Sequence, residues 1–106
     1  MVEYPDSLPT DAVLVIIDRL RGKQIENAKL ILAAWNLTGY ALSQVTKENK
    51  PIIKSEDQRN DSDDAALLES ILTMSENPTG EAVVKAVIPW VLVLKIATRI
   101  LLSVLA

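Results

Sequence analysis

The chain has 106 residues, of which 49% are hydrophobic and 24% charged, and its formal net charge at pH 7 is −3. This length has no room for a second independent core, and this apolar content excludes an intrinsically disordered protein. The sequence contains neither Cys nor His, which excludes disulfides, thiolate or imidazole metal sites and Ser/His or Cys/His nucleophile pairs, while the small negative charge argues against nucleic-acid binding.

The first predicted element is a helix over residues 8–21. Pro9 suits a first helical turn, and Asp11 lies near the positive end of the helix dipole. Gly22 is the expected stop, because glycine readily adopts the left-handed conformation that ends helices. A second interpretation stays open here, since the β-branched run 12–17 also fits a buried parallel strand.

Residues 1–6, which precede this helix, are acidic and contain a proline. They lack the basic and then apolar layout of a secretory signal. We therefore expect a cytoplasmic protein.

The second predicted helix, residues 23–46, has two rows of apolar positions at helical spacing. Such a helix should contact neighbours on two sides. Gly39 lies in its interior and would let another backbone approach closely, for which plain close packing is the simplest interpretation. The first row is Ile25, Ala28, Leu32, Trp35, Gly39, Leu42 and Thr46, and the second is Leu30/Ile31, Ala34, Leu37/Thr38, Ala41 and Val45.

Residues 47–62 are mostly polar and charged, which predicts a long, flexible loop. A short helix over 63–76 should follow, with Asp61 to Asp64 supplying its cap and first-turn acids. The same acids could suggest calcium, but the central Gly and closing glutamate of an EF-hand are missing. The packing face predicted for this helix is Leu67, Leu68, Ile71, Leu72 and Met74.

The last segment, residues 81–106, predicts a helix that is apolar almost all round. Pro89 should kink this helix or split it in two, because proline removes a backbone hydrogen bond. The few polar side chains, among them Lys85, Lys95 and Arg99, fall on one narrow stripe. This basic stripe could meet anionic lipid head groups or the acidic residues 57–64, although a solvated polar edge is commoner.

The same segment is long enough to suggest a membrane anchor. Lys95 and Arg99 would each cost about 2.5 to 3.5 kcal/mol near the centre of a bilayer, however. A helix buried in the soluble protein or in an oligomer is therefore favoured over an interfacial or spanning helix.

Taken together, these patterns predict an all-α four-helix bundle with a long polar loop between helices 2 and 3. The carboxylates read as surface groups, so we expect no catalytic residues, no cofactor and no metal. The excess of apolar positions predicts a homo-oligomer, with a dimer favoured, or binding to a partner protein's helix. The candidate interface residues are Leu32, Trp35, Gly39, Leu42, Trp90, Val91, Leu94 and Leu101.

The predicted function is that of a non-enzymatic helical interaction or assembly module. The alternative is a small membrane-associated protein held by residues 81–106. Nucleic acid is not expected as a partner of either.

Overall fold

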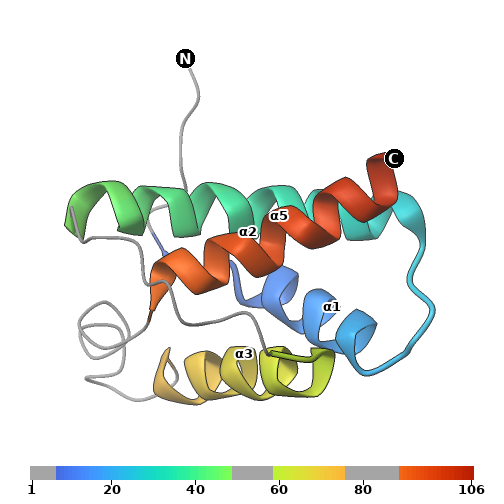
Figure 1. Cartoon of the computed structure of the whole chain (residues 1–106), viewed down its shortest axis with the longest axis horizontal. Coiled ribbons are helices and arrows are strands. Elements are labelled where there is room, and N and C mark those ends of the chain that lie inside the picture. The colour runs from blue at the N-terminus through green and yellow to red at the C-terminus, as the bar shows by residue number, and fades with distance from the viewer. Residues whose placement is uncertain (1–6, 49–58, 76–88) are drawn as a thin grey trace.

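The computed structural model describes residues 7–48, 59–75 and 89–106 of the chain (Figure 1). In this part of the chain there are four helices and no strand, which confirms the predicted all-α bundle. The run 12–17 lies inside the first helix, so its interpretation as a strand is wrong. The helices are α1 (Thr10–Leu20), α2 (Asn27–Glu48), α3 (Asp61–Ser75) and α5 (Trp90–Leu105).

The turn after α1 is a Schellman motif around Gly22. The φ of Gly22 is 92°, in the left-handed region. Its N–H donates to the carbonyl of Arg19 at 3.1 Å, and the N–H of Lys23 donates to the carbonyl of Asp18 at 2.9 Å. This pair of bonds satisfies carbonyls at the end of the helix and confirms Gly22 as the stop.

The second helix begins later than the predicted residue 23. The chain leaves Gly22 in a new direction, and the first bond of α2 runs from the N–H of Leu30 to the carbonyl of Glu26 at 2.9 Å. Residues 23–26 therefore form a connection, in which Ile25 is partly buried against the core.

The last described helix begins at Trp90, directly after Pro89. Proline suits this place because it has no N–H to contribute to a helix. Pro89 is thus the N-terminal cap of α5. The predicted kink or split also involves residues 81–88, which lie outside the described residues. Most of the predicted loop 47–62 is also outside them, and α3 begins two residues before the predicted 63.

The core lies between α2 and the other helices. Helix α2 packs against α1 and most extensively against α5, and α1 packs in turn against α3. At the α2–α5 contact the rings of Tyr40 and Trp90 meet edge to face, with centroids 5.4 Å apart. The largest buried side chains are Trp90, Tyr40, Ile16, Leu30, Leu37, Leu68, Ile71, Val13 and Val93.

Candidate functional site

Helix α2 has two apolar faces on opposite sides of its axis. At about 100° per residue, the buried apolar residues of α2 are centred about 180° from the first row predicted from the sequence; they are Leu30, Ala33, Ala34, Leu37, Tyr40 and Ala41. The second row supplies the core, since Leu30, Ala34, Leu37 and Ala41 are all buried. The first row therefore points away from the core.

Ile25 of this row precedes α2. The rest of the first row is called the outer face of α2, and it consists of Ala28, Leu32, Trp35, Gly39, Leu42 and Thr46. Its large side chains are in water: Leu32 is 61% exposed, Trp35 60% and Leu42 37%. None of the six residues carries a charge, and the hydroxyl of Thr46 donates to the carbonyl of Leu42 at 2.8 Å. The outer face therefore lacks the polar groups that usually cover a solvent-facing helix.

The outer face is joined to a shallow groove between α1 and α2, with a volume of about 170 Å³. Leu32 belongs to both features. The groove is mainly apolar, although Asp11 and Lys29, which have opposite charges, take part in its lining. Its residues are Asp11, Ala12, Val15, Lys29, Leu32, Ala33 and Asn36.

Two of the four candidate interface residues on the C-terminal helix are buried in the core. Trp90 is only 1% exposed and Leu101 is also buried, so neither can meet a partner while the chain stays folded. Their side chains are used in the contact of α5 with the rest of the bundle. Val91 and Leu94 are partly exposed. Of the eight candidates, those on α2 form the continuous exposed surface.

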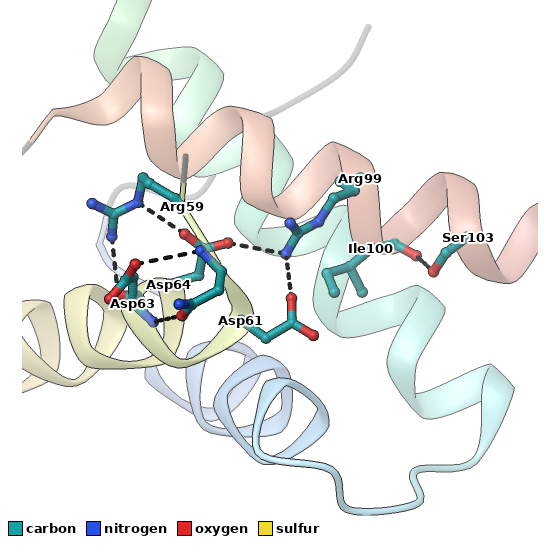
Figure 2. A network of polar contacts seen from close by, with 8 residues as sticks. Arg59, Asp61, Asp63, Asp64, Arg99, Ile100 and Ser103 are labelled. Carbon is teal, nitrogen blue, oxygen red and sulfur yellow. Dashed lines mark hydrogen bonds and ion pairs between the residues drawn. The ribbon is translucent and has the colours of Figure 1, made fainter. Parts of the chain in front are cut away.

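The carboxylate of Asp64, in the first turn of α3, is buried and contacts two arginines (Figure 2). Its side chain is only 3% exposed. Oδ1 accepts from Nε of Arg59 at 3.0 Å, and Oδ2 accepts from Nη2 of Arg99 on α5, also at 3.0 Å. Arg99 also reaches Oδ1 of Asp61 at 3.3 Å. A buried carboxylate with charged donors on both oxygens has the partners that burial demands.

The start of α3 is closed by reciprocal capping bonds. The N–H of Asp63 donates to Oδ1 of Asn60 at 2.8 Å, and the N–H of Asn60 donates to Oδ2 of Asp63 at 3.4 Å. Arg59 adds a bond from Nη2 to the carbonyl of Asp63 at 2.9 Å. This arrangement has the logic of a capping box, with Asp in place of Glu, and it fixes the helix end that presents Asp64 to Arg99.

The network shows that one residue of the basic stripe, Arg99, contacts the acidic residues at the start of α3. Its guanidinium is held by acids of α3 and is about half exposed. Lys95 is exposed, while Lys85 lies outside the described residues. Sequence reasoning considered a contact with the acidic residues but missed Arg59 and the burial of Asp64. The available signal was the run of acids at the start of a helix, which is equally typical of a solvated first turn.

The polar network is a structural clamp that joins α3 to α5 through Asp64 and Arg99. Within residues 7–48, 59–75 and 89–106, no three acidic side chains converge to hold an ion. Asp64 already uses both oxygens on arginines.

Within the described ranges no helix combines the length and the hydropathy needed to cross a membrane.

Comparison with known proteins identifies no relative of the chain. No family model matches the chain, and no similar protein was found among curated sequences or solved structures.

Proposed function

We propose that the chain is a non-enzymatic helical assembly module that associates with another copy of itself through the outer face of α2. The observation that carries the proposal is the exposure of Trp35 together with Leu32 on a helix whose opposite face already fills the core. Contiguous apolar surface of this kind is typical of interaction sites, whereas singly scattered apolar residues are ordinary.

Free energy supports the same conclusion. Fully burying a leucine side chain gains about 1.5 to 3 kcal/mol relative to leaving it in water. In the monomer, Leu32 and Leu42 have realised only part of this gain, and so has the larger Trp35. Aromatic side chains of this type often dominate the energy of protein interfaces. A helix of another protein could use the same face, but a second copy needs no further component.

The alternative is association with a membrane surface through the C-terminal helix. The exposed Leu102 and Leu105 favour it, since both lie in the last turns of α5. Against it, most apolar side chains of α5 are committed to the core, and Arg99 is held by Asp61 and Asp64. The surface left for lipid is therefore smaller than the sequence indicates.

The test is the mass of the full chain in solution, measured without detergent by light scattering after size exclusion. The unaltered chain should have the mass of a dimer at high concentration, and Leu32→Asp should have the monomer mass of 11.6 kDa. The charge introduced by the substitution would have to be buried in the interface, which is costly. Circular dichroism would check that the variant remains helical.

Leu102→Asp is the matched control, because Leu102 is 64% exposed but lies on α5. It should leave the dimer mass unchanged. A chain that stays monomeric at every concentration would contradict the proposal. Sedimentation of the chain with anionic vesicles, abolished by Leu102→Asp and not by Leu32→Asp, would instead support the membrane alternative.

A further inference from the structure

The outer face of α2 is symmetric about position 37 of the sequence. Its residues are separated alternately by four and three positions, which is the spacing of the apolar seam in paired helices. Leu32 and Leu42 lie five residues on either side of position 37, and Trp35 and Gly39 lie two residues on either side. Ala28 and Thr46 form the outermost pair.

A two-fold axis makes this symmetry structurally meaningful. When the axis lies in the contact, perpendicular to the helices and at the level of position 37, a second α2 faces the first and runs antiparallel to it. Each residue before position 37 then lies opposite its counterpart after it, as an isologous contact requires. Leu32 of one copy meets Leu42 of the other, and Trp35 meets Gly39.

The sizes of these pairs are complementary. The largest side chain of the face, Trp35, lies opposite Gly39, which has no side chain, and this layer occurs twice because of the symmetry. Large side chains facing small ones let two helices interdigitate at close distance. A parallel pairing would place Trp35 against Trp35 and leave two facing glycines, which packs poorly at one level and leaves a void at the other.

The groove beside α2 lies at the edge of this contact. On a helical projection Leu32 is displaced toward the side of Lys29 and Asn36, which is the side of the groove. Leu42 is displaced to the opposite side, and a two-fold axis perpendicular to both helices leaves it there. Leu32 of one copy and Leu42 of the other therefore lie side by side across the contact.

Charge and area are consistent with a second copy of modest affinity. The outer face brings no charge into the contact, so pairing it with itself buries no unpaired ion. From Ala28 to Thr46 the face is about 27 Å long at 1.5 Å per residue. A contact centred on one helix belongs to the small interfaces, below about 1,200 Å² in total, which are usually transient.

From these observations we infer that the partner of this surface is a second copy of the chain, with the two α2 helices antiparallel and in register about position 37. This inference rests on the proposed self-association and adds its geometry. The dimer should dissociate on dilution, because the interface is small.

Disulfide cross-linking tests the register directly, since the chain contains no cysteine and any introduced thiol is unique. Leu32→Cys and Leu42→Cys are made separately and oxidised mildly, alone and as an equimolar mixture. The antiparallel register brings position 32 of one copy to position 42 of the other, so the mixture should yield a covalent dimer that joins the two variants. Mass spectrometry identifies the linked peptides.

Each variant alone should give little cross-link. Two copies of position 32 would be about 15 Å apart along the helix, and a disulfide cannot join Cα atoms more than about 7 Å apart. Efficient self-linking of either variant would indicate parallel helices and would overturn the inference. Leu102→Cys, exposed on α5, is the control for random collision.

An exchange of side chains tests the Trp35–Gly39 layer independently. Gly39→Trp should weaken the dimer at least tenfold, because two indoles would compete for one space. Adding Trp35→Gly to it restores one large and one small residue per layer, and should recover most of the affinity measured by light scattering over a dilution series. A dimer that is insensitive to Gly39→Trp would overturn the register while leaving self-association intact, whereas a wild-type chain that is always monomeric would overturn both.

Discussion

The two faces of α2 are both apolar, yet the folded chain treats them in opposite ways. The inner face, with Leu30 and Leu37, is buried against the other helices, while the outer face leaves Leu32 and Trp35 more than half exposed. Hydrophobicity alone does not separate them, since the outer face contains the larger side chain. The difference lies in what each face can reach within one chain.

The comparison separates stability from association. Side chains of the inner face should control the free energy of unfolding, because they fill the core. Those of the outer face should control the mass of the particle in solution. Substitutions of matched size on the two faces test whether stability and association are separate in this way.

The largest effect is expected at the inner face. Leu37 is fully buried, so Leu37→Ala should lower the free energy of unfolding by about 2 to 5 kcal/mol through lost burial and the cavity left behind. Urea denaturation followed by circular dichroism measures this change. A loss below about 1 kcal/mol would mean that this face is not the core of the protein.

An intermediate effect is expected at Asp64, which belongs to neither face. Asp64→Asn turns a nitrogen toward one of the two arginines and should destabilise the fold by about 1 to 3 kcal/mol. The arginines are more exposed than Asp64, which limits the loss because water can solvate them. Urea denaturation of both proteins at the same concentration measures the change in the free energy of unfolding. The affinity between copies should fall by less than this loss of stability, because Asp64 is not on the outer face.

Asp61→Asn is the control for this variant. Its carboxylate also faces Arg99 but is 65% exposed, and exposed ion pairs contribute about 0 to 1 kcal/mol. If the two asparagine variants were equally destabilised, burial of Asp64 would not be the cause.

The smallest effect on the folded monomer is expected at the outer face. Leu32→Ala removes the same atoms as Leu37→Ala but from a side chain in water, so the free energy of unfolding of the monomer should change by less than about 0.5 kcal/mol. Denaturation of dilute protein isolates this value. At high concentration the same variant should show weaker association, which sets it apart from an inert surface substitution.

The helices themselves could be predicted because they depend on local chemistry. Gly22 ends α1 through its own backbone conformation, and the spacing of apolar residues in α2 has the period of a helix. Pro89, at the N-terminal cap of α5, is a different matter, since proline is compatible with both a cap and a kink.

The direction of the faces could not be predicted in the same way. Both rows of α2 have helical spacing, and the choice of the inner row depends on where α5 lies. The two tryptophans show the same limit. Each lies on an apolar helical face, but Trp90 meets Tyr40 in the core whereas Trp35 meets water. Exposure is a property of the tertiary arrangement. Candidate interface residues can therefore be separated into buried and exposed ones only when that arrangement is known.

The clamp at Asp64 also has a consequence for the order of events in folding. Asp64 and Arg99 are separated by 35 residues, whereas the bonds around Gly22 join residues at most five apart. Closing a long loop costs more chain entropy than forming a local turn. We therefore expect the hairpin of α1 and α2 to form early and the contact between Asp64 and Arg99 to form late. The outer face of α2 would then be exposed to other copies before α3 and α5 have packed together.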